Sequence, residues 1–173
     1  MNRKLLVGLS VVGILVVLGL LVSFITRDEL KPQLAATLEA NTAIIEISQL
    51  GAGRVTKAET QQLAGNLAVV TISDNRLLTV YWQQEHGKKL PQDQKDFKQE
   101  LEETIAELEA ITHAPTFDSR FLEVLSERLR TSAERLRSIY RQAGTAKLQE
   151  LLEATYNHQS QFLDQLQKAQ SSQ

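Results

Sequence analysis

The stretch that decides the fold class is residues 116–144, TFDSRFLEVLSERLRTSAERLRSIYRQAG. Its apolar residues recur every three or four positions, which is the spacing of one face of an α-helix. That face contains Phe117, Phe121, Leu125, Leu129, Leu136 and Tyr140. Charged residues fill many positions between them, and Gly144 is suited to end the helix. The stretch therefore predicts an amphipathic helix that packs its apolar face against other helices.

Upstream of it, the sequence predicts two long helices joined by a short connection. The first covers about residues 33–55. The second begins at a capping box, Thr56-x-x-Glu59, in which a hydroxyl and a carboxylate satisfy free backbone amides. It ends at His86, because Gly87 can adopt the left-handed conformation of a C-cap. Its apolar stripe contains Leu63, Leu67, Val70, Leu77 and Tyr81, with Asp74 among them.

Two more helices complete the predicted set. A short one lies over about residues 93–112, between Pro91 and Pro115, and a long one begins at about Thr145. Short connections between the first and second helices, and between the fourth and fifth, predict two antiparallel hairpins. The sequence therefore predicts an all-α fold, an antiparallel four-helix bundle with the short helix as a crossover.

An uncharged apolar run precedes the bundle at residues 5–25, LLVGLSVVGILVVLGLLVSFI. At 1.5 Å per residue, a helix of this length spans about 31 Å, which matches the hydrocarbon core of a bilayer. The alternative is a cleavable signal peptide. However, the run is longer than the apolar part of a typical signal peptide, and bulky residues follow it. We therefore expect an uncleaved transmembrane helix whose partner is the lipid bilayer.

The charges around this run predict its orientation. Arg3 and Lys4 precede it, while Arg27 and Lys31 follow it beside two acidic residues. A short basic N-terminus favours the cytoplasmic side, which places the bulk of the chain outside the cytoplasm. The expected organisation is a cytoplasmic segment 1–4, a transmembrane helix 5–25, a linker 26–32, a bundle domain 33–168 and a flexible tail 169–173.

Composition excludes several classes of function. The chain has 19 Lys and Arg against 21 Asp and Glu, so it lacks the basic excess of a nucleic-acid-binding protein. It has no cysteine, which excludes disulfides, thiolate catalysis and cysteine-ligated zinc. Neither a nucleophile elbow nor a phosphate-binding glycine loop is present. We expect no catalytic residue and no enzymatic activity.

The histidines do not form the pattern of a metal site. Carboxylate-bridged metal sites in bundles need Glu-x-x-His pairs on two helices, and this sequence contains none. His86 and His113 fall at predicted helix C-termini, where a cationic ring is favoured. His158 lies alone within a helix and is expected to be a surface or hydrogen-bonded residue. We therefore expect no metal ligand and no cofactor.

Five residues remain as candidates for a binding role. Glu46 and Asp74 are the acids expected to point partly inward, and His158 is a third candidate for an inward polar residue. The alternative for the acids is a position at the bundle edge or a pair with an arginine, because a buried unpaired carboxylate is costly. Tyr81 and Trp82 form an aromatic cluster, with Tyr81 in the core and Trp82 exposed as a candidate partner contact.

Charges are unevenly distributed between two of the predicted helices. Residues 93–109 contain seven acidic residues, whereas residues 120–141 contain six arginines. Two solvated faces are the favoured interpretation, because exposed ion pairs stabilise by only about 0–1 kcal/mol. The alternatives are that the acidic helix lies along the basic one, or that the arginines meet anionic lipid headgroups.

Four pieces of the sequence match a known pattern: AIIEISQLGAGRVT at 43–56, LAGNLAVV at 63–70, the Leu90-Pro91 turn, and FDSRFLEVL at 117–125. With them, the chain from about Leu34 to Leu166 resembles a ferritin-like bacterial domain family of unknown function. Its members are extracytoplasmic and are often described as predicted outer-membrane proteins.

The resemblance implies a ferritin-like bundle but not the metal site of that family. Many members have an Asp-His pair midway along each of two helices. The corresponding positions here are Val70-Thr71 and Arg128-Leu129, and only His158 falls where another family histidine lies. We therefore expect a membrane-anchored bundle with a structural or interaction role in the cell envelope and an unknown protein partner. The alternative is a ligand- or metal-binding ferritin-like domain linked to stress response.

Overall fold

The computed structural model describes residues 30–87, 90 and 95–171, and its regular elements are all helices. The first helix covers residues 30–54 and is called the N-terminal helix here. The others are α2 (Ala58–His86), α3 (Lys95–Ala110), α4 (Phe117–Tyr140) and α5 (Ala146–Ser171). The prediction of an all-helical bundle is confirmed.

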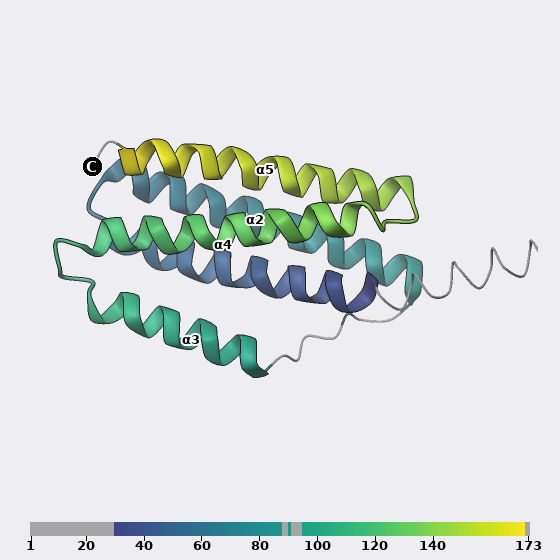
Figure 1. Ribbon diagram of the computed structural model, residues 1–173, viewed down its shortest axis with the longest axis horizontal. Helices are drawn as coiled ribbons and strands as arrows, with labels where there is room; N and C mark the ends of the chain where they lie inside the picture. Colours follow the sequence, from purple (N-terminus) through teal and green to yellow (C-terminus); the bar gives the residue numbers. More distant parts are fainter. Residues whose placement is uncertain (1–29, 88–89, 91–94, 172–173) are drawn as a thin grey trace, which may run out of the picture.

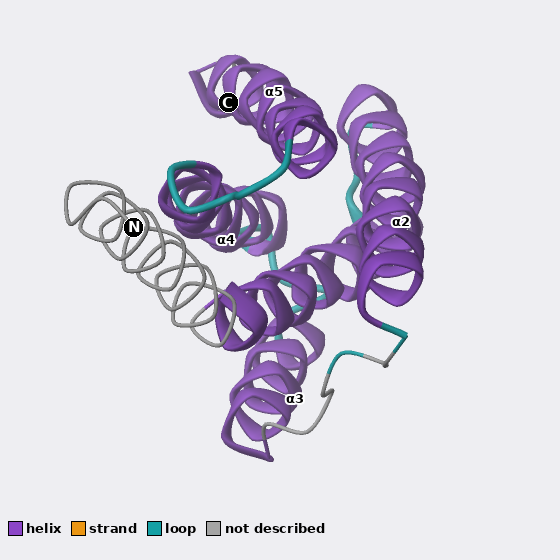
Figure 2. Cartoon of the chain, turned by 90° about the vertical axis from the view of Figure 1, so that its right-hand side faces the viewer, coloured by secondary structure: helices purple, strands orange, loops and turns teal. Residues whose placement is uncertain are grey.

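Four long helices surround one core, and α3 lies outside them (Figures 1 and 2). The N-terminal helix contacts α4 through Ala36, whose carbonyl accepts from Arg135, and through Asn41, which bonds Ser132. Gln33 with Gln142 and Thr56 with Asp118 continue the same order past the helix ends. Residue numbers thus rise on one helix as they fall on the other, so the two run in opposite directions. The same holds for α2 and α5, which are joined by Asp74 with His158 and by Tyr81 with Thr145.

The core consists of two apolar clusters separated by buried polar residues. One cluster contains Ile44, Ile47, Leu67, Phe121, Leu125, Leu129 and Leu166. The other contains Leu34, Leu38, Leu78, Trp82, Leu136, Ile139 and Leu152. Each long helix has one or two buried polar residues between the two clusters: Asn41, Thr71, Asp74, Ser132, Thr155 and Gln159. We call these six residues the polar layer.

The ends of α2 confirm one prediction and contradict another. Gly87 has φ 63° and its N–H donates to the carbonyl of Gln83, so the left-handed C-cap is confirmed. The capping box is wrong: α2 begins at Ala58, and no side chain bonds at its N-cap. The Thr56 N–H and hydroxyl both bond the carboxylate of Asp118, because the start of α4 lies against this turn.

The predicted buried stripe of α2 is also partly wrong. Leu67 and Tyr81 are buried, but Leu77 is 51 % exposed and Leu78, the next residue, is fully buried. This part of α2 is apolar on every side, since Val69, Ile72 and Val80 are exposed as well. Helical spacing alone could not choose between the two faces.

Three predicted boundaries differ from the structure or lie outside it. Residues 30–32 are helical, so the linker expected at 26–32 is shorter at its C-terminal end. Residues 169–171 belong to α5, where a flexible tail was expected. The transmembrane helix predicted at residues 5–25 lies outside the described residues. Among the helices of the described part, none has the length and apolar character needed to cross a membrane.

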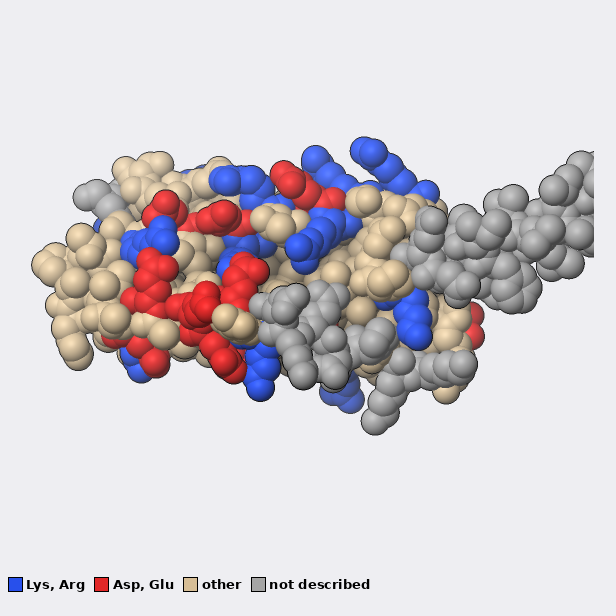
Figure 3. All heavy atoms as spheres, turned by 60° about the horizontal axis from the view of Figure 1, so that its bottom comes forward, with Lys and Arg blue, Asp and Glu red and all other residues tan. Residues whose placement is uncertain are grey.

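Helix α3 packs on α4 and on the N-terminal helix through acidic residues. Glu100 pairs with Arg128 at 2.7 Å, Glu107 pairs with Arg120 at 2.9 Å, and Glu109 pairs with Arg54 at 3.1 Å. Figure 3 shows acidic side chains gathered along this part of the surface beside basic ones. The expectation of two separate solvated faces is therefore wrong. Leu101 and Leu108 are buried beneath the ion pairs, so burial of apolar surface brings α3 against α4.

Candidate functional site

The polar layer is joined by a hydrogen-bonded network around Asn41 of the N-terminal helix. Its amide oxygen accepts from the Ser132 hydroxyl at 2.9 Å and from the Gln159 side-chain amide at 2.8 Å. Its amide nitrogen donates to the side-chain oxygen of Asn75 at 2.8 Å. One side chain thus links all four long helices, and the network satisfies polar groups whose burial would otherwise be costly.

Asp74 and His158 form a second polar pair at the edge of this layer. His158 Nδ1 lies 3.0 Å from Oδ2 and 3.2 Å from Oδ1 of the carboxylate. The Asp74 side chain is 6 % exposed, whereas that of His158 is 46 % exposed. Burial raises the pKa of the Asp74 carboxyl, and the hydrogen bond from His158 opposes that rise. Asp74 is thus buried in the bundle, and His158 is an exposed residue held by a hydrogen bond to it.

The outer face of α2 is apolar and exposed. It contains Val69 (67 % exposed), Ile72 (45 %), Leu77 (51 %) and Val80 (42 %), and we call these four residues the α2 outer face. They lie opposite the buried side of the helix. Among the exposed large hydrophobic residues of the described part, only Tyr140 lies elsewhere. Isolated apolar residues are common on surfaces, but four on one stripe of one helix indicate a binding surface.

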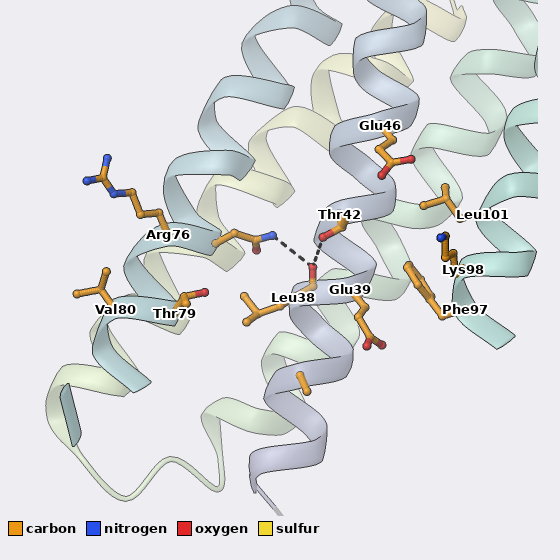
Figure 4. Close-up of a pocket in the computed structure, with 12 residues that line it drawn as sticks. Leu38, Glu39, Thr42, Glu46, Arg76, Thr79, Val80, Phe97, Lys98 and Leu101 are labelled. Atoms are coloured by element: carbon orange, nitrogen blue, oxygen red, sulfur yellow. Dashed lines mark hydrogen bonds between the residues drawn. The ribbon is translucent and has the colours of Figure 1, made fainter. Parts of the chain in front are cut away.

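A groove with a volume of about 490 Å³ lies next to this face, between the N-terminal helix, α2 and α3 (Figure 4). Glu39 and Glu46 line it from the N-terminal helix, and Phe97, Lys98 and Leu101 line it from α3. Arg76 and Val80 belong to both the groove lining and the exposed side of α2. Within the groove, the carbonyl of Leu38 accepts from the Thr42 hydroxyl and the Asn75 amide. The side chains that line the groove thus include acidic and basic groups and one aromatic ring.

Two of the sequence-predicted site residues, Glu46 and Trp82, do not lie where expected. Glu46 is exposed on the groove rather than inward, because Ile44 and Ile47 on either side of it occupy the buried face. Trp82 is 4 % exposed, and its ring lies 4.0 Å from that of His86. Tyr81 is buried as predicted, and its hydroxyl bonds Thr145. Neither aromatic residue therefore offers the exposed surface on which the partner-contact prediction was based.

The sequence-based reasoning missed the polar residues at the centre of the site. Asn41 and Ser132 each follow a buried leucine by three positions, at Leu38 and Leu129, and Gln159 follows the buried Thr155 by four. The sequence did indicate these residues, because each long helix has a polar residue at a core-facing position. This pattern predicts a hydrogen-bonded network only when the four positions are known to lie at one level of the bundle.

The described residues do not assemble a metal centre. No group of three or more histidine, aspartate or glutamate side chains lies close enough there to hold a metal ion. At the positions that correspond to the Asp-His pairs of the resembled family, Arg128 bonds Glu100 and Thr104, and Leu129 is part of the apolar core. Thr71 is a buried member of the polar layer.

Comparison with known proteins shows the fold but no family. No family model matches the sequence, and no curated protein matches it. Among solved structures, the bundle is similar to CopM in the Cu(II)-bound form, with a TM-score of 0.69 and 12% identity. It is also similar to CopM in the Cu(I)-bound form, at 0.67 and 13%, and in the apo form, at 0.67 and 12%. Each match covers 83% of this chain and 96% of that chain. At this level of identity, the likeness shows that the two proteins share a helical-bundle fold.

Proposed function

We propose that this protein is a membrane-anchored helical bundle that serves as an interaction module in the cell envelope. The predicted transmembrane helix, residues 5–25, holds it in the cell membrane, and the bundle lies outside the cytoplasm. Its role is to bind a protein partner rather than to catalyse a reaction. The opposed directions of neighbouring helices and the outlying α3 support the finer proposal that the bundle is ferritin-like.

The observation that supports this function best is the α2 outer face. This face exposes four aliphatic side chains to water: Val69, Ile72, Leu77 and Val80. Burial of their apolar surface against a partner would lower the free energy of the protein. In the interior, by contrast, the Asn41 amide is occupied by Asn75, Ser132 and Gln159. Buried polar atoms without a hydrogen-bond partner in the described part include Ser48 Oγ, Trp82 Nε1 and Gln159 Oε1, which lie on three different helices rather than at one site. The surface rather than the interior is therefore the working part of the domain.

Site-specific photocrosslinking in intact membranes tests the interaction role. A photoreactive residue is placed at Val69 or at Val80, and the matched control is at Ser138, an exposed polar position on α4. We expect a discrete crosslinked adduct from both α2 positions and none from the control. Absence of an adduct, or equal yields at all three positions, contradicts the proposal.

A separate experiment tests the orientation. The chain contains no cysteine, so Gln167→Cys on exposed α5 introduces a unique thiol. We expect an impermeant thiol reagent to label it in cells whose inner membrane is intact and whose outer membrane, where there is one, has been made permeable. Labelling only after the inner membrane is lysed would place the bundle in the cytoplasm.

A metal-binding role is the second candidate. It is favoured by the shared fold with CopM, whose structures are described as Cu(II)-, Cu(I)- and Ag-bound. His158, oriented by the buried carboxylate of Asp74, is the histidine best prepared to act as a ligand in the described part. Metal analysis of the purified full chain after exposure to copper separates the two candidates. One copper ion per chain, lost in His158→Gln but not in His113→Gln, would replace the interaction role with metal binding.

A further inference from the structure

We propose that the partner at the α2 outer face is a second copy of this chain, with the two α2 helices antiparallel. The proposal rests on the interaction function described above and specifies its partner. From Val69 to Val80 the face extends about 16 Å along the helix, which is about three turns. A contact of this length is short for a stable soluble dimer. Confinement of both chains to one membrane raises their effective concentration and allows a weak contact to form.

Charge makes α2 the helix that a second copy can approach most easily. Between Thr60 and Gln84, α2 has only two charged residues, the buried Asp74 and the exposed Arg76. The other exposed helices have more charge: α3 contains six acidic residues, α4 contains five arginines and four acidic residues, and α5 contains five charged residues. In a two-fold contact a surface meets its own copy, so the acidic residues of α3 would face one another, and on α4 and α5 the contact would have to desolvate charged side chains. The nearly uncharged α2 outer face avoids that repulsion.

The order of residues along α2 fits an antiparallel pair. When the two-fold axis passes between Asp74 and Asn75, Val69 lies opposite Val80 of the other copy. Ile72 and Leu77 lie about 140° apart around the helix, on opposite edges of the face, so in an antiparallel pair each lies beside its own counterpart. The four aliphatic residues thus meet aliphatic residues of the other copy. Arg76 then lies opposite Ser73 of the other copy. A parallel pair would instead place the two Arg76 guanidinium groups against each other. An antiparallel pair whose helices lie along the membrane allows both chains to enter the same bilayer.

Disulfide trapping in membranes tests this arrangement with the full chain. Two differently sized tagged forms are coexpressed, one with Val69→Cys and the other with Val80→Cys, in a chain that otherwise has no cysteine. We expect the mixed disulfide between the two forms to dominate. The control, Ser138→Cys on exposed α4, should give no dimer. A Val69→Cys homodimer that exceeds the mixed one overturns the antiparallel pairing, and equal trapping at Ser138 overturns the docking surface.

A charge-pair experiment provides an independent readout. Ile72→Lys alone and Ile72→Glu alone each bring two like charges together where the two copies of residue 72 meet, so we expect either variant to lower the yield of trapped dimer by about tenfold or more. Coexpression of the two variants places a Lys–Glu pair there instead. We expect a mixed dimer to reappear. Ile72 is exposed, so helicity by circular dichroism should be unchanged. A mixture that stays monomeric overturns the proposed register.

The outcomes also separate this proposal from the interaction function. If photocrosslinks at Val69 form adducts of a mass other than twice that of the chain, and no cysteine dimer appears, the face binds a different protein. The interaction function then stands and the self-pairing falls. If neither adduct nor cysteine dimer forms, both fall.

Discussion

Gly51 lies directly beneath the ring of Phe121, and this contact fixes how closely the N-terminal helix approaches α4. A Cβ atom at position 51 would lie 2.1 Å from the Phe121 Cζ and 2.2 Å from its Cε2. Phe121 is fully buried, so its ring cannot move aside without disturbing the core. The structure shows that this glycine allows two helices to pack closely.

Gly51→Ala should therefore destabilise the protein by about 1–3 kcal/mol, the usual cost of overpacking a core. Gly53→Ala is the matched control, because nothing lies within 4 Å of a Cβ at that position. We expect the control to be neutral or slightly stabilising. Urea unfolding of the full chain in detergent, followed through the fluorescence of Trp82, measures both. Equal stabilities for the two variants would show that the Phe121 ring yields without cost.

The buried carboxylate of Asp74 predicts a pH dependence of stability. Burial raises its pKa in the folded protein, so the folded chain binds this proton more tightly than the unfolded chain does. Its contribution to stability is therefore fully present below the unfolded pKa and is lost as the pH rises through the folded pKa. Asp74→Asn keeps the shape of the side chain but does not titrate.

We expect the stability of the native protein, relative to Asp74→Asn, to fall as the pH is raised from about 3.5 to 7, which covers the range in which carboxyl groups titrate. Unfolding free energies at several pH values check this result. Glu46→Gln, which alters an exposed carboxylate, is the control and should show no such trend. If the stability of the native protein relative to Asp74→Asn instead rises with pH, the hydrogen bond from His158 outweighs the effect of burial on the pKa of Asp74.

At the scale of the element, α3 is attached by apolar contacts more than by its ion pairs. Leu108 is fully buried, whereas the pairs of Glu107 and Glu109 involve side chains that are about half exposed. Leu108→Ala should destabilise the attachment by about 2–5 kcal/mol, and Glu107→Gln by about 0–1 kcal/mol. Hydrogen exchange of the α3 amides measures both changes. If high salt or Glu107→Gln releases α3 as much as Leu108→Ala does, the ion pairs are the stronger attachment.

The helices could be predicted from the sequence because their patterns are local, but their contacts could not. The amphipathic pattern of Phe117, Phe121 and Leu125 and the C-cap at Gly87 depend on neighbouring residues alone, and both are confirmed. Thr56 failed as a cap because its hydroxyl bonds Asp118, which is 62 residues away. Leu77 was placed on the wrong face because α2 is apolar all round. That error has a physical meaning, since a helix with two apolar faces has a second surface to bury.

The candidate site was predictable only in part, for the same reason. Asp74 stood out as a charge within an apolar stripe, so its burial could be foreseen. Asn41, Ser132 and Gln159 are uncharged and common on helix surfaces, so each is unremarkable by itself. They form a site because the four long helices bring them to the same level, and that level depends on the lengths of the connections and on packing.

At the scale of the whole molecule, the polar layer divides the core into two apolar halves and fixes the alignment of the helices. Apolar side chains alone tolerate a helix that slides by one turn, whereas a hydrogen-bonded amide does not. Asn41 bonds one residue on each of the other long helices. A shift of any one helix would leave a buried amide or hydroxyl without a partner, which costs about 1–3 kcal/mol for each group.

Asn41→Ala should therefore destabilise the fold by about 3 kcal/mol or more, because it leaves up to three buried partners unsatisfied and creates a small cavity. Thr42→Ala is the control: its hydroxyl is exposed and bonds only the carbonyl of Leu38, so a change within about 0.5 kcal/mol is expected. The combined variant Asn41→Leu, Ser132→Ala, Gln159→Leu removes both partners of the bonds from Ser132 and Gln159 and leaves only the half-buried Asn75 without Asn41, so it should recover most of the lost stability. Its unfolding should be less cooperative, because apolar residues specify the alignment of the helices less strictly.

Urea unfolding, followed by Trp82 fluorescence in one half of the core and by hydrogen exchange in the other, measures stability and cooperativity together. If Asn41→Ala behaves like Thr42→Ala, the layer does not hold the two halves in register.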